Sequence, residues 1–164
     1  MVRLLLAALL IPLAGCPAPA TVEAPDEGFP DGPALGGAPA ERSPDLDAAR
    51  ARWADAGLDA YAMTLQRICF CPSPDYTGPF AVVVRDGAVE SVRLDGAAVD
   101  DERGATVADL FDLIDEAYEK GAAAVDVTYD PEMGYPTSVG IDYDARMADE
   151  EIAYRVSDLR PADR

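Results

Sequence analysis

The most specific chemistry in this sequence belongs to its cysteines, and Cys16 stands at the end of an apolar segment near the start of the chain. Arg3 precedes an apolar run of ten residues, 4–13, which leads into Leu13-Ala14-Gly15-Cys16. A helix that spans a bilayer needs about 20 apolar residues, so this run is too short to cross a membrane. A positive residue, a short apolar run and small residues at its exit are typical of a secretory signal peptide.

The tetrapeptide Leu13-Ala14-Gly15-Cys16 resembles the lipobox of bacterial lipoproteins. In that class the cysteine thiol is alkylated with diacylglycerol, and a signal peptidase cuts just before the cysteine. We therefore expect residues 1–15 to be a signal peptide and Cys16 to be the lipidation site. Each buried methylene contributes about 0.8 kcal/mol, so two or three acyl chains make a stable anchor. The alternatives are an ordinary signal peptide with a chance cysteine, or a buried N-terminal helix.

The residue after the cysteine bears on the membrane that receives the protein. Pro17, rather than aspartate, follows Cys16. By resemblance to the sorting rule of Gram-negative bacteria, this favours the outer membrane over the inner one. The expected location is the bacterial cell envelope. The sequence does not decide between the periplasmic face and the surface face of the membrane.

Cys69 and Cys71 remain as a pair once Cys16 carries lipid, and an exported protein meets an oxidising compartment. Residues two apart on an ideal strand point the same way, but their Cα separation lies near the upper limit for a disulfide. Pro72 and the loop after it supply a bend that would bring them closer. The alternatives are two free thiols and a metal or redox site. Zinc would need two further ligands, which would have to be carboxylates in this chain.

Acidic side chains on the last predicted strands form a second candidate site. Asp130, Asp142 and Asp144 are the residues that we expect to crowd there, with Asp126 beside them. Hard cations such as calcium take carboxylate and carbonyl oxygens, so calcium is the one cofactor that the sequence suggests. The spacing of an EF-hand loop is absent, and the alternative is a solvated face of a sheet.

Aromatic residues near the same strands suggest a contact with another protein. Tyr135 and Pro136 follow a turn and form a candidate partner-binding patch. The alternative for these residues is a place in the hydrophobic core.

Composition excludes several classes of function. The formal net charge is −18, and it becomes −19 without Arg3, from 12 basic and 31 acidic residues. Nucleic acids are bound through Lys and Arg, so we expect no nucleic-acid partner. The chain has no histidine, which excludes Ser-His-Asp and Cys-His catalysis within it. A phosphate-binding Gly-rich loop is also missing. We therefore expect that the protein is not an enzyme. The remaining alternative is an activity that uses carboxylates or thiols.

The chain divides into three parts. After the signal peptide, residues 16–42 hold the lipidated cysteine and a tether in which Pro, Gly and Ala fill 16 of the 26 positions from 17 to 42. Such a segment buries too little apolar surface to offset its ordering entropy, so we expect disorder. Fully extended, it would reach roughly 80 Å. Residues 43–164 then form a single domain of a size that supports one core.

Periodicity and end signals predict two helices and about six strands in this domain. Ser43 and Pro44 begin a helix that stops at Gly57, and Thr106 with Asp109 begins a second that stops near Gly121. Strands are expected at 61–70, 80–85 and 89–94, then, after the second helix, near 125–130, 138–143 and 152–157. The expected fold is α+β, in the order α-βββ-α-βββ. It is an antiparallel sheet with both helices on one face, and the two αβββ halves are similar in pattern.

A family resemblance covers about residues 50–160. It is carried by Trp53, Tyr61, Cys69-Phe70-Cys71-Pro72, Val83-Val84-Arg85-Asp86-Gly87, Tyr129-Asp130, Gly134-Tyr135-Pro136, Ile141-Asp142 and Asp149-Glu150. These residues resemble the bacterial family called domain of unknown function 6174. The resemblance implies an envelope lipoprotein and carries no activity. The expected architecture is also similar to small periplasmic modules of the PepSY or β-lactamase-inhibitor-protein kind, which bind proteins; that comparison rests on fold alone.

The function expected from the sequence is therefore that of a lipid-anchored envelope protein which binds or scaffolds another envelope component. The alternative is a domain that binds calcium or is stabilised by it.

Overall fold

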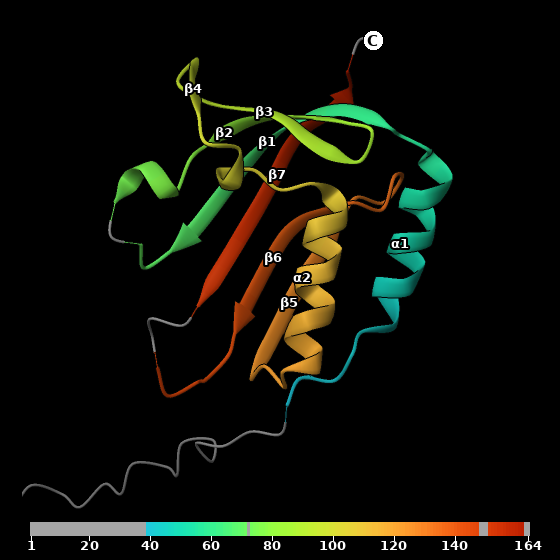
Figure 1. Ribbon diagram of the computed structural model, residues 1–164. Coiled ribbons are helices and arrows are strands. Elements are labelled where there is room, and N and C mark those ends of the chain that lie inside the picture. Colours follow the sequence, from blue (N-terminus) through green and yellow to red (C-terminus); the bar gives the residue numbers. More distant parts are fainter. Residues whose placement is uncertain (1–38, 72, 148–150, 163–164) are drawn as a thin grey trace, which may run out of the picture. The chain divides into compact units, whose positions relative to one another are not determined.

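The computed structural model describes residues 39–71, 73–147 and 151–162 (Figure 1). The predicted signal peptide, Cys16 and the tether up to residue 38 lie outside the described residues. Two helices and seven strands follow one another with two short 3-10 turns between them. In chain order they are α1 (Pro44–Ala56), β1 (Ala60–Cys69), η1 (Pro74–Tyr76), β2 (Phe80–Arg85), β3 (Ala88–Leu94), β4 (Ala97–Val99), η2 (Asp101–Arg103), α2 (Val107–Glu119), β5 (Ala124–Tyr129), β6 (Pro136–Asp142) and β7 (Ile152–Pro161).

The ends of both helices confirm the sequence prediction. The Ser43 side chain accepts a hydrogen bond from the Asp45 N–H, and the chain leaves α1 through Gly57 at a φ of 59°. At α2, the Thr106 side chain accepts from the Asp109 N–H while the Asp109 carboxylate accepts from the Thr106 N–H. This reciprocal pair is a capping box, which satisfies two backbone donors that a helix start leaves free.

The strands form one antiparallel sheet in the order β4-β3-β2-β1-β7-β6-β5. The last strand, β7, is therefore central, between β1 and β6 (Figure 1). Two groups of strands, β1–β4 and β5–β7, meet where β1 pairs with β7. The predicted α+β class, the antiparallel pairing and the order of elements are confirmed.

The sheet has seven strands rather than the predicted six, because a short strand forms in the expected polar loop 95–105. Asp95 and Gly96 both have a positive φ, of 50° and 81°, and turn the chain so that β4 pairs back on β3. Asp86 and Gly87 make the β2–β3 turn in the same way, with φ values of 49° and 76°. Both are two-residue hairpins of the Asp-Gly kind.

The hydrophobic core lies between the two helices and one face of the sheet. Trp53 joins α1 to this core, with its ring edge-on to Tyr61 at 5.3 Å and to Tyr135 at 6.3 Å. The N–H of Val107 donates to the Tyr61 hydroxyl at 2.8 Å, which attaches the start of α2 to β1. The largest fully buried side chains are Phe80, Phe111, Leu46, Leu65, Leu110 and Ile114.

The residues just before α1 contact the domain. The N–H of Ala40 donates to the Ala122 carbonyl, and Arg42 forms ion pairs with Asp47 and Asp115. Residues 39–42, expected to be part of a disordered tether, therefore contact the domain. The partner of Ala40 lies just after α2, and those of Arg42 lie in α1 and α2, contacts that composition does not reveal.

Candidate functional site

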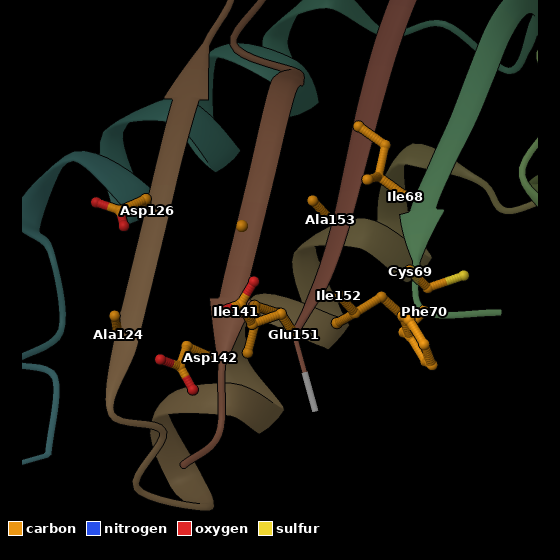
Figure 2. Close-up of a pocket in the computed structure, with 11 residues that line it drawn as sticks. Ile68, Cys69, Phe70, Ala124, Asp126, Ile141, Asp142, Glu151, Ile152 and Ala153 are labelled. Atoms are coloured by element: carbon orange, nitrogen blue, oxygen red, sulfur yellow. The ribbon is translucent and has the colours of Figure 1, made fainter. Parts of the chain in front are cut away.

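The opposite face of the sheet has no helix over it and contains a hollow. We call this surface the open face. The hollow has a volume of about 550 Å³ and lies at one end of β1, β7, β6 and β5. Its lining residues are Ile68, Cys69, Phe70, Ala124, Asp126, Gly140, Ile141, Asp142, Glu151, Ile152 and Ala153 (Figure 2).

Strand register explains why the surface is hollow there. Ile68 pairs with Ala153, Ala153 with Gly140, and Gly140 with Asp126, so these four residues form one row across four strands. The two middle members have a methyl group and a hydrogen atom as side chains. The surface is therefore recessed at the middle of the row, while Ile68 at one end has a large apolar side chain and Asp126 at the other has a carboxylate.

A second row lies two residues further along β6 and β5, at Asp142 and Ala124, which pair with each other and lie on the same face. Phe70 and Glu151 lie just beyond the ends of β1 and β7 and also line the hollow. In Figure 2 the carboxylates of Asp126 and Asp142 lie on one side of the hollow, and Ile68 and Phe70 lie on the other. The hollow thus has an acidic side and an apolar side.

The apolar side is unusually exposed for side chains of this type. Phe70 is 87% exposed and Ile68 is 40% exposed. Phe70 stands between Cys69 and Cys71, which form a disulfide with their Cα atoms 5.1 Å apart. β1 ends at Cys69, and the Cα separation lies within the range that a disulfide bridges. The short ring formed by the bridge restricts the backbone that carries Phe70.

The acidic side consists of carboxylates without cationic partners. Asp126, Asp142 and Glu151 form no ion pair with any described residue. The Oδ1 atom of Asp142 is buried and accepts no hydrogen bond within the described part of the chain. Arg155 lies in the adjacent row of the same face, and it too forms no ion pair there. Within the described residues, the carboxylates of the hollow therefore have no cation in direct contact.

The three residues of the predicted calcium site do not lie together. Asp130 is in the β5–β6 turn, where its carboxylate accepts from the N–H groups of Glu132 and Met133. Asp142 is at the other end of β6, about 20 Å away for six residues of strand. No group of three or more His, Cys, Asp or Glu side chains suited to a metal ion occurs among residues 39–71, 73–147 and 151–162.

Asp144, the third of these residues, forms an ion pair with Arg146 of its own loop. The Arg146 guanidinium donates to both carboxylate oxygens, at 2.9 and 2.8 Å, and the Arg146 N–H donates to Oδ1 at 3.1 Å. These hydrogen bonds favour the charged form and lower the pKa of Asp144 to about 2.

The predicted partner-binding residues are part of the core. Tyr135 is buried beside Trp53, and Pro136 is among the fully buried side chains. Burial is also the main reason that the pKa of Tyr135 is raised. Their burial matches the core alternative, because a residue enclosed by α1 and the sheet does not present a surface to another protein.

Sequence reasoning missed Phe70, Gly140 and Ala153 as site residues. Each is unremarkable alone, and the hollow exists only because Gly140 and Ala153 fall side by side in the sheet. The available signal was the alternation of strands 138–143 and 152–157, which places both small residues on the polar face. Their pairing could not be read without the register of β6 against β7.

A comparison with protein-family models finds one described as a family of unknown function (DUF6174), which matches residues 45–161. This range extends from the first turn of α1 to the end of β7 and is more than half of the chain. No curated protein and no solved structure matches the chain significantly. No helix within the described residues is long and apolar enough to cross a membrane.

Proposed function

The chain belongs to the family of unknown function DUF6174, and from this site we propose that it is a non-catalytic binding module of the bacterial cell envelope. In this proposal a lipid on Cys16 holds the protein at the outer membrane. The hollow on the open face is the surface that binds another envelope component.

The observation that carries the proposal is the state of the open face. Its hollow combines a Phe side chain that is 87% exposed with three carboxylates that have no ion-pair partner among the described residues. Neither feature stabilises the isolated domain, since an exposed aromatic ring gains little burial and unpaired like charges repel. Exposed apolar surface next to polar groups is common at binding sites.

The sequence supports a binding role over a catalytic one. The whole chain lacks histidine, the usual general base near neutral pH, and lacks a Gly-rich phosphate loop after a strand. Of the described residues that line the hollow, the carboxylates are the only ones that could transfer protons, and they lie beside an open, solvent-exposed surface.

The lipobox and the segment after it support the anchoring part of the proposal. Residues 17–38 precede the described domain and are rich in Pro, Gly and Ala. A Pro-rich chain of that length reaches on the order of 70 Å when extended. The domain would then meet partners well away from the membrane surface.

Two experiments test the two parts separately. The Cys16→Ser variant should leave the membrane pellet when cells are fractionated, and a variant that stays in the pellet would refute the lipid anchor. For the binding surface, a photo-crosslinking residue is placed at Ala153 on the floor of the hollow, or at Ala108, which is exposed on α2. We expect a discrete adduct in living cells from position 153 alone. Equal adducts, or none, at both positions would contradict binding at the hollow.

A further inference from the structure

We infer that the hollow on the open face binds an extended segment of a partner protein that carries a basic and an apolar side chain about four residues apart. The inference rests on the proposed function and specifies the chemistry of its partner. The Lys or Arg side chain would lie against the acidic side of the hollow, and the apolar one against Ile68 and Phe70.

Charge is the first argument. Elsewhere in the described chain several carboxylates have a cation of their own; those in ion pairs are Asp47, Glu90, Asp112, Asp115, Glu116 and Asp144. Asp126, Asp142 and Glu151 gather in one hollow without such a cation, on a protein with a net charge of −18. A cationic ligand relieves repulsion among these carboxylates, whereas an anionic one adds to it.

The environment of Asp142 is the second argument. A buried carboxylate oxygen without a donor carries a desolvation cost that a hydrogen bond would remove. Its Oδ1 atom is in this state with respect to the described residues. An ammonium or guanidinium group provides the missing donor together with the missing charge, and such charge-assisted hydrogen bonds are the stronger kind.

The spacing follows from the width of the sheet. Ile68 on β1 and Asp126 on β5 are the ends of one row and are separated by three strand-to-strand steps. At about 4.8 Å a step, the row is about 14 Å wide. Residues i and i+4 of an extended peptide point to the same side and lie about 13 Å apart. One face of an extended segment therefore reaches both sides of the hollow.

Other occupants fit less well. The segment of this chain that precedes the described domain, residues 16–38, contains Glu23, Asp26, Glu27 and Asp31 and no Lys or Arg, so it complements neither the charge nor the spacing. A second copy of the chain brings another −18 charges. A partner of opposite charge remains, and a polypeptide supplies a basic and an apolar group at a fixed separation.

The test uses the purified full chain and an array of synthetic peptides with a Gly-Ser background. Each peptide carries one arginine and one phenylalanine, at every spacing from one to six residues, and a matched array has glutamate in place of arginine. We expect maximal binding at a spacing of about four residues, and at least tenfold weaker binding throughout the glutamate array.

Variants locate the binding to the hollow. Asp142→Asn and Phe70→Ala should each weaken binding of the best peptide about fivefold or more. Gly140→Val should abolish it, because the new side chain fills the floor while its Cβ has ordinary contacts, the nearest being the Asp126 carbonyl oxygen at 3.7 Å. Asp55→Asn is the control; it removes one charge from an exposed position on α1 and should bind like the unaltered chain. Thermal unfolding verifies that each variant is folded.

Several outcomes would overturn the inference. Equal binding to the arginine and glutamate arrays would do so, as would binding that survives Gly140→Val. Displacement of the peptide by millimolar calcium, dependent on Asp142, would identify a metal site instead. A dimer in sedimentation that Gly140→Val dissociates would identify a second copy as the occupant. In each case the crosslinking contrast between positions 153 and 108 still decides the proposed function independently.

Discussion

The two faces of the sheet are built from alternate residues of the same strands, yet the side chains of one face are much more buried than those of the other. On the face beneath the helices, β2 contributes Phe80, Val82 and Val84, all of them wholly buried. On the open face, the end of the sheet that holds the hollow contributes Gly140 and Ala153 as its floor. Phe70 is left exposed to solvent there. Packing on the first face explains the fold. The arrangement on the second buries little apolar surface, and we propose that it serves binding.

Charged residues show the same contrast. Asp115 on α2 receives Arg42 and Arg50, each with a nitrogen–oxygen distance of 2.5 Å, so one carboxylate connects both helices and the chain before α1. Asp142 has no cation among the described residues. Asp115 thus holds elements together, whereas Asp142 remains available to a ligand. Substitutions at matched positions test this contrast.

The largest effect is expected for a pair of phenylalanines. Phe80→Ala empties a fully buried site and should lower the free energy of unfolding by about 3–5 kcal/mol. Phe70→Ala removes a side chain that is 87% exposed and should change it by less than about 0.5 kcal/mol. Urea denaturation followed by circular dichroism measures both. A Phe70→Ala variant that loses as much stability as Phe80→Ala would show that the open face is part of the core.

A pair of glycines in the β5–β6 hairpin gives the next effect. Gly134 has a φ of 81°, and a Cβ there would collide with the Ala49 carbonyl and lie 2.8 Å from the Arg52 Cβ. Gly134→Ala should cost about 2–3 kcal/mol, since left-handed backbone and a clash with α1 add together. Gly140→Ala meets no such contact and should raise stability by up to about 1 kcal/mol, because glycine weakens a strand. Equal destabilisation by both would mean that the floor of the hollow is closely packed.

Local signals in the sequence accounted for most of the fold. Ser43 and Thr106 mark helix starts because their side chains accept hydrogen bonds from backbone N–H groups of the first helical turn. Alternation of apolar and polar residues marks the late strands because successive side chains point to opposite faces of a sheet. The strand β4 was missed although its turn, Asp95-Gly96, repeats Asp86-Gly87. Its three residues are too few to show an alternation.

The candidate site was much less accessible to sequence reasoning. The sequence places Asp130, Asp142 and Asp144 on the polar face of the last predicted strands, but the β5–β6 hairpin places Asp130 at the far end from Asp142. The hollow depends on Gly140 lying beside Ala153, a pairing set by where β7 inserts between β1 and β6. Strand order of this kind is decided by the whole core and leaves no local mark.

A pair of aspartates should give a smaller effect. Asp115→Asn removes the charge that Arg42 and Arg50 share and should lower the free energy of unfolding by about 1 kcal/mol, less in 0.5 M salt because the group is partly exposed. Asp142→Asn breaks no ion pair with a described residue and should be neutral within about 0.5 kcal/mol. Denaturation at low and high salt measures both. If Asp142→Asn proves the more destabilising, its carboxylate is structural.

The smallest effect concerns Asp144, which is paired with Arg146, whereas Asp142 two residues earlier forms no ion pair with a described residue. The Arg146 hydrogen bonds lower the pKa of Asp144 to about 2, so the folded state favours the ionised carboxylate. The resulting contribution to stability is present above the ordinary carboxyl pKa and is lost as the pH falls through about 2. Titration of the Asp144 carboxyl carbon by NMR should show this midpoint. Arg146→Gln should move the midpoint upward toward the ordinary value, whereas Arg155→Gln, on the open face, should leave it unchanged. An unshifted midpoint in Arg146→Gln would mean that the pairing is not maintained in solution, and that Asp144 belongs with the carboxylates available to a ligand.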